Sequence, residues 1–328
     1  MKRIISAVSI LAVLTVHAQS YTARNGRLHV KGTQLCNQAG GAVQLKGFST
    51  HNITYCPECV TYDAVKSNRD FWGANVIRAT VYTDDFWNKE SYNNNPKRSK
   101  DLVDSLVRWS EELGIYCIID WHILTQGNPN AKIHAGADAF FQEMSLKYAD
   151  KPHVLYEICN EPNGNGVTWD SIADYANRII PIIRKNSPQS VIIVGTPQWC
   201  QLLGSVQPSK LVDSVNVMYA FHFYAASHAG LLPMFLSEIH RIPVFATEWG
   251  VCESTGNDNV NYGTAEKYLD AMYQHIAGQD TVRVSWCNFS YGDLNEAAAA
   301  LKPRSCTDKK WENMSPTGLF VRDYMQAH

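Results

Sequence analysis

Two glutamates, each at the end of a short apolar segment, are the side chains of this sequence best placed to do chemistry. Residues 154–162 read Val-Leu-Tyr-Glu-Ile-Cys-Asn-Glu-Pro, and residues 243–250 read Pro-Val-Phe-Ala-Thr-Glu-Trp-Gly. Such segments are typical of buried strands, and Pro162 cannot continue a strand ladder. The sequence therefore predicts Glu161 and Glu248 at the carboxyl ends of buried strands, where barrels and doubly wound α/β folds carry their active sites. One such glutamate could merely end a strand, whereas two with the same layout favour a site.

A pair of carboxyl groups at one apolar rim suits the hydrolysis of a glycosidic bond. One carboxyl group must be protonated to release the leaving oxygen, and the other must be ionised to attack the anomeric carbon. Their surroundings should therefore move their pKa values apart. The sequence has no glycine-rich phosphate loop after its first predicted strand and no serine nucleophile elbow. Dinucleotide chemistry and serine-based hydrolysis are therefore not indicated.

Six further side chains are predicted to point toward the same rim, because strand residues two apart share a face. They are Arg78, Tyr82, His122, His222, Tyr224 and Trp286. A charged Arg78 inside an apolar strand must be paired, because an isolated buried charge is very costly. Beside a functional carboxylate it would keep that group ionised, although a structural pair with Glu157 would also satisfy it. Each histidine, and Trp286, could alone be an ordinary core residue, but six such residues beside two carboxylates favour a site.

The histidines also raise the alternative of a metal site. A hydrolytic zinc site typically needs three protein ligands and an open position. His222 and His228 flank a predicted loop, but the sequence contains no His-Glu-x-x-His segment. We therefore expect neither a catalytic metal nor a cofactor.

The elements that must position these residues alternate between strand and helix along the chain. Predicted strands cover residues 43–48, 75–82, 116–122, 154–162, 191–195, 217–224, 243–250 and 282–289. Predicted helices cover residues 61–72, 99–113, 137–149, 171–186, 231–240, 264–277 and 316–325, with a short unclear helical piece near residue 209. The nearly continuous apolar strands indicate burial on both faces, as in a parallel sheet. Eight units in one chain predict an α/β (β/α)8 TIM barrel, which needs roughly 250 residues. A short β-hairpin within residues 26–48 should precede it.

The first residues have the pattern of a secretory signal peptide. Met-Lys-Arg is followed by an apolar run over residues 4–16 and then by Val-His-Ala, which predicts cleavage after Ala18. The run is too short to span a membrane. We therefore expect residues 1–18 to be a signal peptide and residues 19–328 to form a single catalytic barrel domain, in a secreted or periplasmic protein.

The charge balance excludes some classes of partner. The chain has 29 basic and 31 acidic residues, a formal net charge of −2, so neither nucleic acid nor an anionic membrane surface is expected as a partner. No linker or low-complexity tract is evident, and therefore no appended binding or docking module is expected. We expect a monomer.

The nine cysteines leave one question open. Cys117, Cys159 and Cys287 lie inside apolar strand-like segments, where cysteine is usually a small buried hydrophobe. Cys56 and Cys59 are the only close pair, and no second pair completes a zinc set. Either a disulfide that staples their loop or two thiols would fit them.

Taken together, these segments resemble glycoside hydrolase family five. The resemblance is carried by Asn-Glu-Pro at 160–162 and Thr-Glu-Trp-Gly at 247–250. Further matching segments occur in the family's order, at residues 47–51, 76–79, 119–122, 222–224 and 285–288. The chain is most similar to secreted bacterial endo-β-1,4-glucanases, and the similarity extends from about Gly41 to the end.

The resemblance implies a (β/α)8 barrel and a retaining double displacement. Glu161 matches the family's acid/base and Glu248 its nucleophile. Asn160 matches the residue that hydrogen-bonds the substrate 2-hydroxyl. Arg78 matches the residue that keeps the nucleophile ionised, and Tyr224 the phenol beside it.

The resemblance also implies roles in substrate binding. His122 and His222 match the family's site histidines, and Trp286 matches the aromatic platform under the sugar before the cleaved bond. His51 and Tyr82 match contacts on the non-reducing side. The implied substrate is a β-glucan polysaccharide or cello-oligosaccharide.

Two positions depart from the family pattern. Tyr55 stands where these cellulases usually carry Trp, and Leu294 where they often carry Lys. Both changes concern glucose binding on the non-reducing side. Four aromatic residues are candidates to stack on sugars: Tyr55, Trp199, Trp249 and Trp286, whereas Trp87 and Trp169 could equally pack in loops.

Two alternatives remain at the level of the sequence. A retaining endo-hydrolase of mannan, xylan or mixed-linkage glucan would use the same residues. A carbohydrate-binding protein on a barrel scaffold would lack a catalytic carboxylate, but both Glu161 and Glu248 are present.

Overall fold

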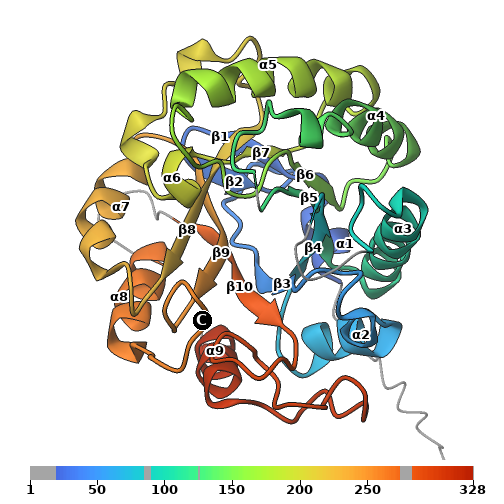
Figure 1. Ribbon diagram of the computed structural model, residues 1–328, viewed down its shortest axis with the longest axis vertical. Coiled ribbons are helices and arrows are strands. Elements are labelled where there is room, and N and C mark those ends of the chain that lie inside the picture. The colour runs from blue at the N-terminus through green and yellow to red at the C-terminus, as the bar shows by residue number, and fades with distance from the viewer. Residues whose placement is uncertain (1–19, 85–89, 125, 274–282, 328) are drawn as a thin grey trace, which may run out of the picture.

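The computed structural model describes residues 20–84, 90–124, 126–273 and 283–327. The predicted signal peptide, and Trp87, lie outside the described residues. Eight parallel strands close into a barrel in the order β10-β3-β4-β5-β6-β7-β8-β9, inside a ring of helices (Figure 1). The strands are β3 (Lys46–Thr50), β4 (Val76–Tyr82), β5 (Tyr116–His122), β6 (Val154–Glu157), β7 (Ile192–Val194), β8 (Val217–Tyr224), β9 (Val244–Gly250) and β10 (Ser285–Tyr291). The predicted TIM barrel is confirmed.

Helices follow the strands in sequence and cover the outside of the barrel (Figure 1). They are α1 (Tyr21–Asn25), α2 (Tyr62–Asp70), α3 (Pro96–Leu113), α4 (Ala137–Lys147), α5 (Trp169–Asn186), α6 (Pro197–Cys200), α7 (Leu232–Glu238), α8 (Tyr262–Met272) and α9 (Pro316–Ala327). Local signals set their ends: the Asn95 side chain caps α3, and Gly114 ends it in the left-handed conformation, as helix termini favour. No helix among the described residues is long and apolar enough to cross a bilayer.

The barrel interior is apolar in its lower half and polar in its upper half. Inward-facing residues near the strand starts, among them Tyr116, Ile118 and Leu155, form one buried apolar cluster. The hairpin of β1 (His29–Lys31) and β2 (Gln34–Cys36) closes this end, and its Leu35 joins the cluster. Farther along the strands the inward-facing residues are polar. They include Ser49, Arg78, Asp120 and Glu157, all fully buried. The functional end of the barrel is therefore a polar layer above a hydrophobic base.

Two strand predictions differ from the structure for local reasons. The first barrel strand begins at Lys46 and not at Val43, because Val43 donates its N–H to Leu35 O and so extends the hairpin. β6 ends at Glu157, so Glu161 lies in the loop that follows it. That loop is still held at both sides, because the N–H of Ile158 bonds to β7.

The predictions for the cysteines were partly wrong. Cys117, Cys159 and Cys287 are fully buried, as expected. Cys59 is bonded to Cys306, which is 247 residues away in sequence, so neither a Cys56–Cys59 staple nor a pair of thiols describes this segment. The disulfide joins the loop before α2 to the loop before α9.

We predict that Leu35→Ala destabilises the protein by about 2–5 kcal/mol, because it removes a fully buried side chain from the base of the barrel. Urea denaturation would measure the loss. Lys31→Ala, an exposed change on the same hairpin, is the control and should have little effect. A loss below about 1 kcal/mol for Leu35→Ala would mean that the hairpin is not part of the core.

Candidate active site

Arg78, on β4, is the centre of the polar layer. Its Nε donates to Glu157 Oε2 at 2.7 Å, and Nη2 donates to Glu157 Oε1 at 3.2 Å and to Asn160 Oδ1 at 2.7 Å. Nη1 donates to Ser49 Oγ at 3.1 Å and to Glu248 Oε2 at 3.0 Å. All five guanidinium hydrogens therefore have acceptors.

A third carboxylate also surrounds Arg78, since Nη2 lies 3.0 Å from Asp120 Oδ2. Burial alone would lower the pKa of Arg78, but the charges of Asp120, Glu157 and Glu248 outweigh it and hold the pKa well above its usual value. Arg78 is therefore a permanent positive charge below the site. The same burial raises the pKa of Asp120 and of Glu157 to about 7, against the opposing effect of Arg78.

Glu248 has a donor on each carboxyl oxygen. The Tyr224 hydroxyl donates to Oε1 at 2.8 Å, and Arg78 donates to Oε2. The ion pair and the hydrogen bond fix the orientation of the carboxyl group. The pairing of β8 with β9 shifts between Ala220 and His222. This bulge, an extra residue on β9, lets Thr247 and Glu248 both reach the polar layer.

Glu161 is held by a histidine whose protonation follows from its own contacts. Thr247 Oγ1 donates to Glu157 Oε1 at 2.8 Å, so it can only accept from His222 Nε2, 2.9 Å away. Burial lowers the pKa of His222 to about 4, which leaves the ring neutral. Its Nδ1 therefore carries no hydrogen, and the 2.9 Å contact with Glu161 Oε1 requires a proton on the carboxyl group of Glu161.

The electrostatics of Glu161 agree with this assignment. Burial raises the pKa of Glu161 to about 8; Arg78 opposes the shift, and the neighbouring Asp120 and Glu157 charges add to it. Glu161 is thus protonated at neutral pH, whereas Glu248 is paired with Arg78 and accepts from Tyr224. The two carboxyl groups therefore have the different surroundings that acid-assisted displacement needs.

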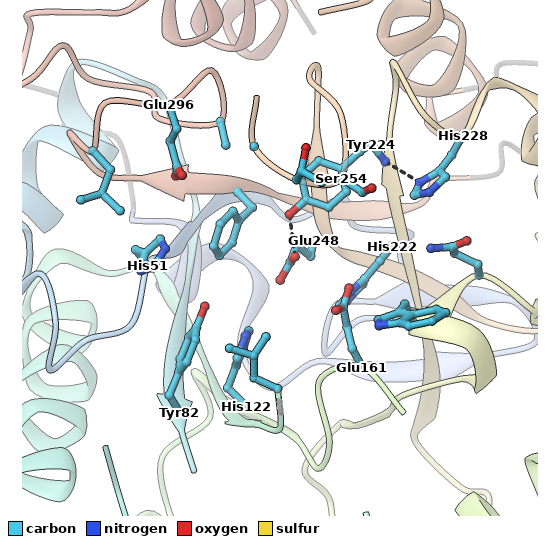
Figure 2. Close-up of a pocket in the computed structure, with 18 of the residues that line it drawn as sticks. His51, Tyr82, His122, Glu161, His222, Tyr224, His228, Glu248, Ser254 and Glu296 are labelled. Carbon is cyan, nitrogen blue, oxygen red and sulfur yellow. Dashed lines mark hydrogen bonds and ion pairs between the residues drawn. The ribbon is translucent and has the colours of Figure 1, made fainter. Parts of the chain in front are cut away.

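The two glutamates face each other across the middle of a cleft (Figure 2). One oxygen of Glu161, one oxygen of Glu248 and one ring nitrogen of His222 lie within 4.8 Å of one another. Such proximity fits a nucleophile and an acid acting on one bond, which retaining glycosidases hold roughly 5–5.5 Å apart.

Among the described residues, the same group and the set Cys59, Asp293 and Cys306 are the clusters close enough to share a cation. In the first cluster His222 is hydrogen-bonded at both nitrogens. In the second the two sulfurs are bonded to each other. Neither offers a set of uncommitted ligands.

Asp120 and His122 form a second buried pair under the cleft. His122 Nδ1 lies 2.7 Å from Asp120 Oδ2, and its ring stacks on Tyr82 with centroids 3.9 Å apart. Burial holds the pKa of His122 well below its usual value, so the ring is neutral. With Nδ1–H directed to Asp120, Nε2 is left as an acceptor beside the cleft.

The cleft has a volume of about 700 Å³. Seven of the predicted site residues line it: His51, Tyr82, His122, Glu161, His222, Tyr224 and Glu248. Arg78 and Asn160 lie just below and hold its floor, because Asn160 accepts from Arg78 and donates to Ile123 O. Both departures from the family pattern, Tyr55 and Leu294, also line the cleft.

Trp286 was predicted in this group, and the structure corrects that prediction. Only 1% of Trp286 is exposed, because it points outward from β10 and packs edge-on against Trp249, which is also buried. Neither ring can stack on a sugar. The inward face of β10 carries Cys287 and Phe289, and Phe289 lines the cleft beside His51.

The sequence-based reasoning thus missed Phe289, and also Glu296, His228, Gln201 and Ser254, which line the cleft. The alternation of faces would have found Phe289 had Cys287 been taken as inward-facing. The others come from loops, for which no periodic signal exists.

Trp199 also lines the cleft and lies on an unusual turn. Gln198, Trp199 and Cys200 have φ values of 56°, 55° and 60°, a left-handed conformation that costs roughly 1–3 kcal/mol per residue. Contacts to the Glu161 loop hold the turn: Trp199 N–H donates to Pro162 O at 3.1 Å, and Cys200 Sγ lies 2.9 Å from Asn160 O. The turn leaves 48% of Trp199 exposed to the cleft.

Comparison with known proteins finds one family over most of the chain. The model of the family described as Cellulase (glycosyl hydrolase family 5) matches residues 36–294. The chain is 39% identical to an endoglucanase of Clostridium saccharobutylicum, over 96% of this chain and 68% of that protein. It is 37% identical to endoglucanase E-5 of Thermobifida fusca, over 93% of this chain and 64% of that protein. The chain thus spans about two thirds of the length of these relatives.

The fold is similar to solved cellulase structures. The catalytic domain of the Thermobifida fusca endoglucanase, solved in complex with cellotetraose, superposes with a TM-score of 0.83 at 36% identity and covers 94% of this chain and 100% of that one. A structure named cellulase Cel5C_n gives a TM-score of 0.85 at 35% identity, with 92% of each chain covered.

We predict that Gly250→Ala breaks the hydrogen bond between Tyr224 and Glu248. A Cβ at Gly250 would lie 2.7 Å from Tyr224 Cδ1, so the ring must move, and overpacking of this kind costs about 1–3 kcal/mol. A crystal structure of the variant and its melting temperature would show both effects.

Gly263→Ala, in α8, is the matched control, because a Cβ there would meet nothing closer than 3.9 Å. It should leave the melting temperature unchanged or higher. A Gly250→Ala structure in which Tyr224 still contacts Glu248 would contradict the proposed role of Gly250.

Proposed function

The chain belongs to the cellulase family, glycosyl hydrolase family 5, and we propose that it is a retaining endo-β-1,4-glucanase that cleaves internal bonds of cellulose and related β-glucans. The observation that carries the proposal is the close approach of two glutamates in different surroundings: their oxygens lie within 4.8 Å, Glu248 contacts Arg78 and Tyr224, and Glu161 contacts His222. A retaining glycosidase needs one protonated and one ionised carboxyl group at about 5–5.5 Å.

In the proposed first step, Glu248 Oε attacks the anomeric carbon and forms a covalent glycosyl-enzyme. Glu161 gives its proton to the leaving oxygen, so the glycosidic bond breaks without expelling an alkoxide. The ion pair with Arg78 and the hydrogen bond from Tyr224 direct the attacking carboxylate.

In the second step, Glu161 is ionised and acts as a base toward water. Water attacks the anomeric carbon, its proton passes to Glu161, and Glu248 is released with the original anomeric configuration restored. The neutral His222 can donate to neither oxygen of Glu161 through Nδ1, so it does not stabilise the carboxylate strongly. This favours the return of the proton to Glu161.

The substrate proposal rests on the cleft and on the relatives. Tyr55, beside His51, and Trp199, beside the loop of Glu161, are 45% and 48% exposed and offer aromatic faces in the cleft, which suits the binding of sugars. The matched relatives are named endoglucanases, and one was solved with cellotetraose.

We also propose that the protein acts outside the cytoplasm, in the periplasm or the medium. The signal-peptide pattern of residues 1–18 supports this. So does the Cys59–Cys306 disulfide, because disulfides persist in oxidising compartments.

Product analysis on soluble carboxymethyl-cellulose, with mannan and xylan in parallel, tests the activity. A rapid fall in viscosity with release of cello-oligosaccharides is expected. Release from mannan or xylan alone would keep the chemistry and change the substrate. No reaction on any polymer would favour a carbohydrate-binding protein.

Two variants should separate the roles of the glutamates. Glu161→Ala should lower the rate on polymer roughly a hundred- to ten-thousandfold, yet still react with dinitrophenyl cellobioside, whose leaving group needs no proton. Azide needs no general base, so it can attack the glycosyl-enzyme in place of water and should give the β-glycosyl azide.

Glu248→Ala should lose about ten-thousandfold or more on every substrate. Azide entering the space of the carboxylate should displace the leaving group of dinitrophenyl β-cellobioside from the opposite face and give the α-glycosyl azide, a product of inverted configuration. The same azide anomer from both variants, read by NMR, would refute the assignment of roles.

The pH dependence follows from Glu161. Its acid form is present below its pKa of about 8 and is lost as the pH rises through that value. We therefore predict that kcat/KM on unactivated cello-oligosaccharides falls above about pH 8. With dinitrophenyl cellobioside this alkaline decline should be absent from the first step. An equal decline for both substrates would assign it to another group.

A further inference from the structure

The end of the cleft that contains His51 is built from two loops that are far apart in sequence. The loop after β3 supplies His51 and Tyr55, and the loop after β10 supplies Leu294 and Glu296. Figure 2 shows His51 and Glu296 together on one side of the pocket, away from Glu161. Any sugar bound at this end must touch both loops.

The Cys59–Cys306 disulfide joins these same two loops. Cys59 is four residues beyond Tyr55, and Cys306 lies in the loop that carries Leu294. Both cysteines are buried, with Cα atoms 5.0 Å apart. In Figure 1, α2, which follows Cys59, lies beside the segment before α9, which contains Cys306.

Asp293 connects the disulfide to the wall of the cleft. Its Oδ2 accepts the N–H of Cys306 at 2.9 Å, and its Oδ1 lies 3.6 Å from Cys59 Sγ. The next residue, Leu294, lines the cleft and packs on the main hydrophobic cluster. The positions of Tyr55 and Leu294 are therefore set relative to each other through one short chain of contacts.

We propose that the Cys59–Cys306 disulfide, with Asp293, is a positioning element for glucan binding. It holds Tyr55 and Leu294 at a fixed separation, so that the sugars at this end of the cleft meet a preformed site. The inference rests on the proposed glucanase function. It assigns the disulfide an effect on affinity that is separate from its contribution to stability.

The expected effect is on KM and not on kcat. Without the disulfide the two loops must be ordered by the substrate itself, which weakens binding. We expect KM for cellopentaose to rise about tenfold, equivalent to about 1.4 kcal/mol. The turnover number should change by less than about twofold, because Arg78 and Glu248 lie on strands and keep their contacts.

The test compares the oxidised wild type with the double variant Cys59→Ser/Cys306→Ser, and measures kcat and KM on cellopentaose together with circular dichroism and the melting temperature. Cys36→Ser, which removes a buried thiol at the opposite end of the barrel, is the matched control and should leave KM unchanged. Peptide mapping of the wild type should recover a Cys59–Cys306 cross-linked fragment.

Asp293→Ala provides a second variant that keeps the disulfide. Its KM should lie between those of the wild type and the double variant, with kcat unchanged. This variant tests the proposal even if the double variant does not fold. A lower melting temperature with unchanged KM in these variants would overturn the proposal, as would an equal loss in kcat. A wild type that is inactive on cellopentaose would instead refute the proposed function.

Discussion

A single buried guanidinium organises the upper half of this barrel. Arg78 is fully buried, and a charge in that position is tolerable only when every donor is satisfied. Its acceptors come from β3, β6, β9 and the loop after β6, and it also faces Asp120 on β5. The strands around the site are thus all bound to Arg78. Glu248, the proposed nucleophile, is one of the carboxylates that neutralise the charge of Arg78.

The two functional glutamates belong to one continuous hydrogen-bond network. Glu161 donates to His222, His222 donates to Thr247, and Thr247 donates to Glu157. Arg78 donates to both Glu157 and Glu248. The donors of Glu161, His222 and Thr247 thus run in sequence toward Glu157, and Arg78 joins Glu157 to Glu248 by donating to both.

The direction of this network gives the two glutamates different surroundings. Glu248 touches the positive charge itself and the hydroxyl of Tyr224. Glu161 meets only the unprotonated nitrogen of a neutral ring, and burial raises its pKa to about 8. The difference between acid and nucleophile therefore follows from which end of one network each residue occupies.

Much of this arrangement could be predicted from the sequence, because parallel strands impose a period of two. That period places Arg78, His122, His222 and Tyr224 toward the interior, as the structure has them. It failed for Trp286, since the segment is buried on both faces, carries aromatic residues on both, and does not show which parity points inward. The bulge in β9 lets both Thr247 and Glu248 reach the polar layer, and it cannot be recognised from the pattern of apolar residues.

Features that depend on loops could not be predicted in this way. Cys59 and Cys306 are 247 residues apart, and only the closure of the barrel brings their loops together. The left-handed turn that presents Trp199 contains no glycine, so its sequence gives no signal of positive φ. The cleft walls are therefore the part of the site that required the structure.

The most direct test of this account is to trap the glycosyl-enzyme. Dinitrophenyl 2-deoxy-2-fluoro-cellobioside should react once and then stall, because the fluorine slows both steps whereas the activated leaving group speeds only the first. Proteolysis and mass spectrometry of the trapped enzyme would identify the labelled residue. The account predicts a single adduct on Glu248. An adduct on Glu161 or Glu157, or turnover to a product of inverted configuration without any adduct, would contradict it.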